Sequence, residues 1–420
     1  MTLLFSESFA GYTSSADFTL RGWTLTNSGF IAVNSTGSPW GDNCLEFTSR
    51  STGGLPSMSK NFHATAGSGT TARMAFWIKT DAGFVPSDFE SASGHVVSLE
   101  NSGSTNWIDA TISNEGYLMF SITESARSSL KNYAVLSRTP INDGNWHHVE
   151  YELVISTTVG TAKLWIDGEL QHSVTGRDTS DAGTNLNNFT KVTLSANRLN
   201  DTAQKVYLKD VIVWDDLGSD FTGALPNHIH RIGTIFPDGA GNSAQFTPST
   251  GSNYQNVDEA SPNSDTDYNE SSTAGHIDSF TFGNMPWSTD AIFSVVSSLI
   301  ARSTAGTPTL RSKGRISSTD YNGTTHTLST SYTAYEHVWD DSPASTNDWT
   351  DSEIDGAEFG YEAVSGANPV RVTRQLVEVV ADEASTDEAR VTSFFIEVVL
   401  KQGTPPASSS STMSSVVVTS

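Results

Sequence analysis

Apolar and polar residues alternate along most of this chain with the two-residue period of β-strands. Segments 74–79 and 149–155 place an apolar residue at every second position, and few windows show the 3.6-residue period of a helix. Clusters of Gly, Asn, Asp and Ser separate these runs, as turns do between short strands. The pattern predicts an all-β protein.

Three segments predict specific local structures. Asp167-Gly168 lies between two apolar runs, and this dipeptide favours a two-residue hairpin turn because both positions tolerate positive φ angles. Residues 205–215 read as one long strand with a bulge near Asp210. A short helical turn is expected around 349–353, where the strand pattern lapses.

Changes in composition divide the chain. The strand-like run ends near 214–218, and Pro226 and Pro237 follow, residues that cannot donate to a ladder. After Gln402 the chain becomes rich in Ser and Pro. We therefore predict a first domain over 1–220, a linker over 221–236, a second β-sandwich over 237–402, and a short extended tail over 403–420.

The charge balance narrows the classes of function. The 420 residues hold 23 Lys and Arg against 47 Asp and Glu, a formal net charge of −24. Such a chain repels phosphate backbones and anionic lipid headgroups, so we expect no nucleic-acid partner and no membrane adhesion. The apolar runs are strand-sized, so no membrane insertion is expected.

The cysteine count and the N-terminal residues narrow the possible classes of protein further. Cys44 is the single cysteine, which excludes a disulfide within the chain and a cysteine-based metal site. Residues 1–7 lack a basic start followed by a long apolar core, so no signal peptide is expected.

Motifs in the first region carry a family resemblance. Residues 143–150 read DGNWHHVE, residues 164–170 read LWIDGEL, and residues 208–215 read LKDVIVWD. This order resembles laminin-G-like, concanavalin A-like jelly-roll sandwiches and covers about residues 1–220. The resemblance implies two packed antiparallel sheets. Members of this group bind sugars, bind proteins or act as spacers, so the fold alone does not choose among these functions.

The second region resembles another module. Its motifs include FPDGAGN at 236–242, NYQNVDE at 253–259, STAGHID at 272–278 and FGYE at 359–362. The series looks like a β-sandwich module of structural proteins of tailed bacteriophages, where it often accompanies a laminin-G-like domain. This resemblance implies a virion protein assembled in the host cytoplasm, with other virion proteins and copies of itself as partners.

Together these features predict a virion structural protein that is not an enzyme. We expect it on the tail or baseplate, where it would bind host-surface glycans weakly through many copies. A capsid decoration or head-fibre protein is the first alternative. The second is a concanavalin A-like glycoside hydrolase, because Glu353, Asp355 and Glu358 fit a carboxylate string that could supply a nucleophile and a general acid from a strand.

Aromatic residues in loop-like, Asn- and Asp-rich surroundings are the candidate sugar platforms. Sugar sites stack an aromatic face on the ring and bond its hydroxyls with polar side chains. The candidates are Trp40, Trp107, Tyr117 and Tyr133. Trp77, Trp165 and Trp214 lie in strand-like runs and are expected in the core.

Two further sets of residues are candidate metal ligands. Asp265, Asp267 and Asn269 present oxygens at alternating positions, as a Ca²⁺ loop would, although an Asx-rich turn explains the same pattern; no other cofactor is expected. His228 and His230 could share a strand face as zinc ligands, with solvent-facing polar residues as the alternative.

The apolar end of the tail is a candidate attachment arm. Val416, Val417 and Val418 follow a Ser-rich stretch and could add a strand to the sheet of a neighbouring protein.

Overall fold

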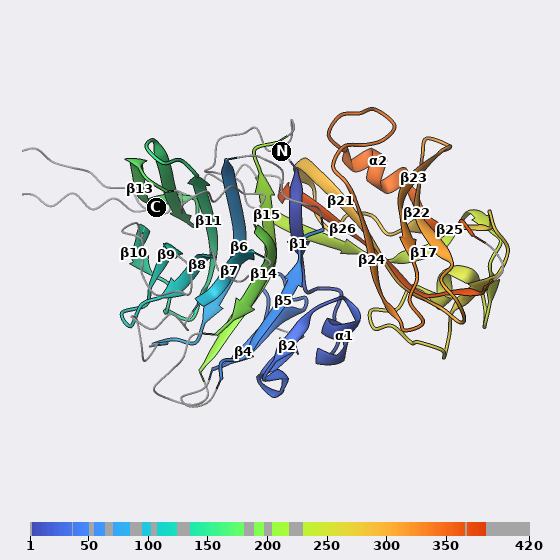
Figure 1. The fold of residues 1–420 in the computed structure, drawn as a ribbon, viewed down its shortest axis with the longest axis horizontal. Helices are drawn as coiled ribbons and strands as arrows, with labels where there is room; N and C mark the ends of the chain where they lie inside the picture. Colours follow the sequence, from blue (N-terminus) through green and yellow to red (C-terminus); the bar gives the residue numbers. More distant parts are fainter. Residues whose placement is uncertain are drawn as a thin grey trace, which may run out of the picture. The chain divides into compact units, whose positions relative to one another are not determined.

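The computed structural model describes residues 2–35, 37–49, 54–63, 70–84, 95–101, 107–123, 135–179, 189–196, 204–217, 230–365 and 368–383. The contacts join Met1–Ala384 into one compact unit. The predicted all-β class is confirmed, because the described residues form four antiparallel sheets with two short α-helices (Figure 1). The predicted tail over 403–420, with Val416, Val417 and Val418, lies outside the described residues.

The first two sheets form a jelly-roll-like sandwich from the N-terminal half of the chain. The eight-stranded sheet runs in the order β13-β12-β11-β6-β15-β4-β3, with β1 also paired to β15. Its strands are β1 (Leu3–Glu7), β3 (Ile31–Asn34), β4 (Cys44–Thr48), β6 (Thr71–Thr80), β11 (Trp146–Val154), β12 (Gly160–Ile166), β13 (Glu169–Arg177) and β15 (Lys205–Asp215). The seven-stranded sheet comprises β2 (Thr24–Thr26), β5 (Ser57–Asn61), β7 (His95–Asn101), β8 (Trp107–Ile112), β9 (Tyr117–Thr123), β10 (Val135–Pro140) and β14 (Phe189–Ser195).

The second pair of sheets follows in the chain. The six-stranded sheet comprises β16 (His230–Ile235), β18 (Thr247–Pro248), β19 (Asn269–Ser271), β21 (Thr289–Ser303), β24 (Thr333–Trp339) and β26 (Val370–Glu383). The five-stranded sheet comprises β17 (Pro237–Ala244), β20 (Ile277–Phe282), β22 (Thr309–Ile316), β23 (Thr319–Thr327) and β25 (Glu358–Ala363). Strand β16 lies within the segment predicted as a linker, where it pairs with β26 along its whole length.

The helices are short and lie between strands. They are α1 (Ser15–Leu20), α2 (Asp351–Gly356) and the 3₁₀ turns η1 (Ser28–Phe30) and η4 (Asn253–Asn256). Helix α2 confirms the turn expected near 349–353. The strand pattern does not predict helix α1; Asp17 stabilises its first turn by accepting hydrogen bonds from the backbone N–H groups of Thr13 and Ser14 at 2.8 and 3.1 Å. Within the described ranges, no helix is long and apolar enough to cross a membrane.

Each pair of sheets encloses an apolar core. In the first, Phe120 from the seven-stranded sheet stacks on Tyr151 from the eight-stranded sheet, with ring centroids 4.2 Å apart. In the second, Val377 of β26 packs in the same cluster as Phe359 of β25. These contacts bury the alternate apolar positions that the sequence pattern marks.

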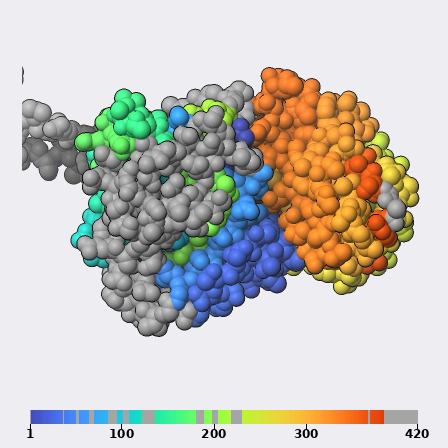
Figure 2. Space-filling model, viewed as in Figure 1, coloured from blue at the N-terminus to red at the C-terminus, as the bar shows by residue number. Residues whose placement is uncertain are grey.

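A third apolar cluster joins the two sandwiches. It packs Leu3, Ala75, Ile212 and Trp214 of the eight-stranded sheet against Ile232, Phe293, Val296 and Val380 of the six-stranded sheet. Figure 2 shows atoms of the N-terminal segment, in blue, directly against atoms of the second sandwich, in orange. Strand β26 is therefore buried on both faces, which explains why the adjacent residues Val379 and Val380 are both apolar.

On strand β11, two outward positions of the alternating pattern are buried rather than exposed to solvent. Glu150 and Glu152 occupy the outward positions of the strand, which would face solvent in an isolated sandwich. They are only 1% and 6% exposed. The outer face of the eight-stranded sheet is thus partly a buried surface.

Candidate functional site

The outer face of the eight-stranded sheet carries a row of four side chains on neighbouring strands. Trp146 of β11 pairs with Lys79 of β6, and Tyr207 of β15 pairs with Lys79 on its other side. Glu46 of β4 lies opposite Tyr207. Directly opposed residues in a ladder project from the same face of a sheet. We call Trp146, Lys79, Tyr207 and Glu46 the sheet-end row.

The neighbouring positions show why the row faces outward. Ile78, Leu208 and Leu45 each adjoin a row residue along a strand, and all three belong to the core of the first sandwich. Because successive side chains alternate between faces, the row must point away from that core. Trp146, Lys79 and Tyr207 are half-buried, which leaves part of each accessible to a ligand.

The two aromatic rings of the row are held close together. Their centroids lie 6.4 Å apart with an interplanar angle of 56°, and the Lys79 Nζ lies 5.7 Å from the Tyr207 ring centroid. The Trp146 indole N–H donates to the Gly37 carbonyl at 2.7 Å. This hydrogen bond fixes the orientation of the indole.

Hydrogen bonds and charge also fix the polar end of the row. The Glu46 carboxylate accepts from the Asn34 amide at 2.8 Å and pairs with the Lys205 ammonium at 2.7 Å. Burial, together with the nearby carboxylates of Asp81 and Glu46, raises the pKa of Tyr207 to about 12. The phenol therefore stays protonated at neutral pH and can donate a hydrogen bond.

A second row lies beside the first and is covered by a loop. Trp77 pairs with His148 on one side and with Lys209 on the other. Trp40, from the loop before β4, packs edge-on against Trp77 at 5.1 Å between centroids. Asp42 of the same loop pairs with the Lys209 ammonium at 2.9 Å. Trp77, expected in the core, thus lies half-buried on the outer face.

Trp40, a predicted sugar platform, already has a partner. The Arg231 guanidinium lies 3.8 Å from the Trp40 ring centroid and 3.9 Å from that of Trp287. One face of Trp40 is therefore occupied by a cation–π contact. Trp40 borders the sheet-end row and helps to fix the covering loop.

The other predicted sugar-binding residues are not placed beside the sheet-end row. Tyr117 begins β9 in the seven-stranded sheet and is half-buried. Trp107 begins β8 of the same sheet, but its side chain lies outside the described part of the structure. Tyr133 lies outside it entirely. The structure thus places Trp40 beside one sheet and Tyr117 and Trp107 in the other.

The residues proposed as calcium ligands contact other protein groups. Asp265 pairs with Arg302 at 2.8 Å and with Arg371 at 2.9 Å. Asp267 accepts from the Asn263 amide at 3.1 Å. Asn269 is buried, and both ends of its amide are bonded within the protein. In the described ranges, no group of three or more His, Cys, Asp or Glu side chains is placed to hold a metal ion.

The histidine considered for zinc is not solvent-facing. His230 is 2% exposed, and its two ring nitrogens contact Glu150 at 3.2 Å and Asp382 at 2.5 Å. The expectation of an accessible histidine is wrong because the outer face of the eight-stranded sheet packs against β16, with His148 and Trp214 beside the His230 ring. His228 lies outside the described residues.

The carboxylate string does not lie on one strand face. Glu353 is in helix α2, where it accepts from the Thr350 backbone N–H at 3.0 Å in a capping box. Glu358 begins β25 and accepts from the Ser279 hydroxyl at 2.6 Å. Because Glu353 lies in a helix, it does not share a strand face with Glu358, which is the arrangement that the hydrolase alternative requires.

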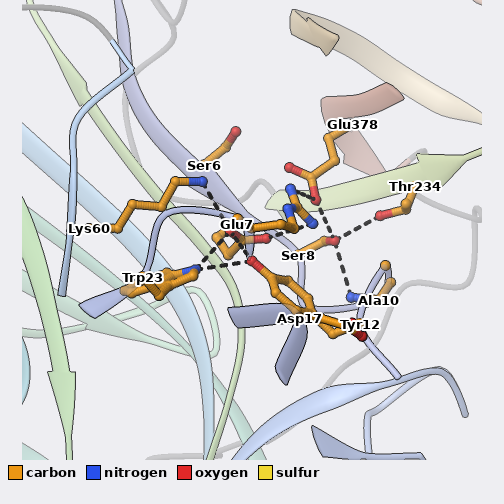
Figure 3. Close-up of polar contacts among 12 residues, drawn as sticks. Ser6, Glu7, Ser8, Ala10, Tyr12, Asp17, Trp23, Lys60, Thr234 and Glu378 are labelled. Atoms are coloured by element: carbon orange, nitrogen blue, oxygen red, sulfur yellow. Dashed lines mark hydrogen bonds and ion pairs between the residues drawn. The ribbon is translucent and has the colours of Figure 1, made fainter. Parts of the chain in front are cut away.

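A buried charge network is the other conspicuous polar cluster (Figure 3). The Arg21 guanidinium contacts Glu7 at 3.2 Å and Glu378 at 3.3 Å, and Lys60 contacts Glu7 at 3.4 Å and Glu336 at 2.8 Å. Arg21, Glu7 and Glu378 are 0–1% exposed. A substrate cannot reach groups buried to this extent, so the network is a structural junction between the sandwiches.

Sequence reasoning misses the residues of the sheet-end row. In the sequence, Lys79 alternates with core positions, and Trp146 belongs to the DGNWHHVE motif of the fold. Neither position therefore indicates a ligand site. The signal is present in KVYLKD at 205–210, where the outward positions hold Lys, Tyr and Lys. Only the strand register shows that Tyr207 meets Lys79 and Trp146.

Comparisons with known proteins give structural similarity alone. No family model and no curated protein matches the sequence. An endo-β-1,4-glucuronan lyase from the fungus Trichoderma reesei is similar over 51% of this chain and 96% of its own, with 16% identity and a TM-score of 0.38. An endo-1,3-β-glucanase from Streptomyces sioyaensis covers 51% and 96%, with 11% identity and a TM-score of 0.35. The CBM22 tandem domain of Paenibacillus barcinonensis Xyn10C covers 90% and 98%, with 13% identity and a TM-score of 0.26.

These similarities correct one expectation and leave another untested. The expectation that the chain is not an enzyme is contradicted, because the similar structures include a lyase and a glucanase. Their names describe those proteins, and identities of this size transfer neither reaction nor substrate. None of the three is named as a phage protein, and a place in a phage virion stays a prediction.

Proposed function

We propose that this protein binds carbohydrate through the sheet-end row. The observation that supports this best is the strand register, which sets the half-buried Trp146, Lys79 and Tyr207 side by side on one sheet face, with the 8% exposed Glu46 next to Tyr207. Sugar rings pack their C–H faces on aromatic side chains, while their hydroxyls need donors and acceptors within reach. The row supplies both kinds of group.

Each residue of the row has a distinct role in this proposal. The Trp146 indole is held by Gly37 and offers a pre-oriented apolar surface. The Tyr207 hydroxyl and the Lys79 ammonium donate hydrogen bonds, and the Glu46 carboxylate accepts them. Because Glu46 is already fixed by Asn34 and Lys205, it does not have to be ordered when a sugar binds.

The binding test uses variants of the two aromatic residues. Trp146→Ala and Tyr207→Ala should each weaken binding to a glycan array or to immobilised polysaccharide by about tenfold, since a lost aromatic contact costs about 0.5–1.5 kcal/mol beyond its buried area. Binding is measured by fluorescence titration or calorimetry. Phe30→Ala is the matched control, because Phe30 is an aromatic residue that is 37% exposed and is not a member of the row.

Two results would overturn the proposal. One is a wild-type protein that binds no glycan in the array. The other is equal loss of binding in Phe30→Ala and in the two row variants. Any glycan that binds is also incubated with the protein, and release of reducing ends or unsaturated products is measured, so that turnover is detected where it occurs.

The setting of this binding is a finer proposal. We place the protein in a tailed-phage virion, among other virion proteins and copies of itself, so that many weak sites act together. The support is the sequence resemblance of 236–362 to a phage module. Immunogold labelling of virions would detect the protein on tail or head, and unlabelled particles would refute this setting. Deletion after Gln402 tests whether the tail attaches the protein, since truncated protein should then be missing from particles.

A further inference from the structure

Among the described residues, Lys79 differs from the other lysines because no carboxylate lies within ion-pair distance of its ammonium group. In the described ranges, Lys60, Lys163, Lys191, Lys205, Lys209 and Lys313 each lie within 4.0 Å of an Asp or Glu oxygen. Within those same ranges, the contact found for the Lys79 ammonium is the Tyr207 ring at 5.7 Å. Among the residues that the structure describes, no acid thus balances the charge of Lys79, in a chain whose net charge is −24.

Two acids in the same part of the sheet, Glu46 and Asp81, are bound to other groups. Glu46 pairs with the Lys205 ammonium at 2.7 Å, and Asp81 accepts from the Lys205 backbone N–H at 2.8 Å. Neither carboxylate therefore needs Lys79 as its partner. Lys79 is also half-buried between two aromatic residues, where water screens a charge less than on an open surface.

We propose that the ligand of the sheet-end row is an acidic glycan whose sugar carboxylate pairs with the Lys79 ammonium. This inference rests on the proposed carbohydrate binding and names its ligand class. A carboxylate on a sugar ring packed against Trp146 or Tyr207 would reach the ammonium between them. The contact is a charge-assisted hydrogen bond, which is stronger than one between neutral groups.

The order of the row also sets the direction of the ligand. Lys79 and Glu46 lie on opposite sides of Tyr207, two strands apart, which corresponds to about 10 Å in the direction across the sheet. Glu46 would repel a sugar carboxylate, whereas Lys79 attracts one. The acidic residue of the glycan is therefore placed over Lys79, and a neutral residue with free hydroxyls lies toward Glu46.

The experiment compares two forms of one polysaccharide. A uronic-acid polysaccharide and its carboxyl-reduced counterpart differ only in the group that Lys79 is proposed to bind. Wild-type protein should bind the acidic form at least tenfold more tightly, as expected for a hydrogen bond to a charged group. Lys79→Met keeps the apolar stem and should abolish this preference, whereas Lys79→Arg should retain most of it.

The control separates loss of this contact from a general loss of positive charge. Lys163→Met removes a lysine on strand β12 of the same sheet whose partner Glu152 also pairs with Arg73, and it should leave the preference unchanged. If wild-type protein binds both forms equally and Lys79→Met has no effect, this inference is wrong while carbohydrate binding stands. If it binds neither these forms nor any glycan of the array, the proposed function fails first.

Discussion

Two neighbouring histidines at the junction of the sandwiches, His148 of β11 and His230 of β16, have opposite pKa shifts. Burial lowers the pKa of His148 to about 4. Burial also acts on His230, but hydrogen bonds and charge from Asp382 and Glu150 outweigh it and raise the pKa to about 9. The two rings lie 5.8 Å apart, so one stays neutral beside a charged neighbour.

These two histidines together contribute a term to the free energy of unfolding that is largest near pH 6.5, the pKa of histidine in an unfolded chain. Between pH 4 and 6.5 the unfolded chain protonates His148 and the folded protein does not, so the contribution of His148 rises with pH. Between pH 6.5 and 9 the folded protein keeps a proton on His230 that the unfolded chain loses, so the contribution of His230 falls, by at most about 3 kcal/mol. Each slope is measured by denaturant unfolding across this range as the difference in unfolding free energy between the wild type and a histidine variant, because the raised pKa values of Asp210, about 7, and Glu259, about 8, also affect stability here.

Single substitutions assign each slope to its residue. The difference in unfolding free energy between the wild type and His230→Gln should fall between pH 6.5 and 9, and the difference between the wild type and His148→Gln should rise between pH 4 and 6.5. The depressed pKa values of Glu7 and Glu336 add a further loss of stability only as pH falls below about 4.5, the usual value for Glu. A difference between the wild type and His230→Gln that is constant from pH 6.5 to 9 would contradict the assignment to His230.

Local signals in the sequence predict individual strands well. Strand β15 has the predicted bounds and a register shift after Lys209, with Asp210 at a φ of 47°. The Asp167-Gly168 turn joins β12 and β13 with φ angles of 52° and 79°. Both features depend on a few adjacent residues, which is why the sequence alone suffices.

Features that depend on distant segments are not predictable in this way. Glu150 reads as an exposed strand position, yet its burial depends on β16, about 80 residues later in the chain. The sheet-end row combines four strands that are far apart in the sequence, so its members are neighbours only through register.

The β12–β13 hairpin offers a test of local backbone preference. Gly168 has a φ of 79°, and no atom lies within 4 Å of the place that a β-methyl group would take, so Gly168→Ala would add strain without a clash. We expect a loss of about 1–2 kcal/mol in unfolding free energy. Gly29→Ala is the control, because Gly29 also has open space but no positive φ. Equal stability of the two variants in denaturant titrations would show that the turn relaxes.

At the scale of the whole unit, apolar packing and buried charge together join the two sandwiches. The apolar junction cluster includes Trp214 and Phe293, and the charge network links Glu7 and Arg21 of the first sandwich to Glu378 of the second. Removing one member of a buried ion pair leaves an uncompensated charge in a poorly solvated place, which costs about 3–5 kcal/mol.

The junction should therefore make Met1–Ala384 unfold as one cooperative unit. Arg21→Met leaves Glu7 and Glu378 without their shared partner and should lower stability by about 3–5 kcal/mol. Because the lost contacts hold the sandwiches together, the single calorimetric transition of the wild type should also separate into two. Arg315→Met is the matched control, since it removes an arginine whose partner Asp320 is 46% exposed within one hairpin, and such pairs contribute about 0–1 kcal/mol. If both variants melt in one transition at the wild-type temperature, the network does not couple the sandwiches, and the apolar cluster and the other junction contacts, such as His230 with Glu150, must hold them.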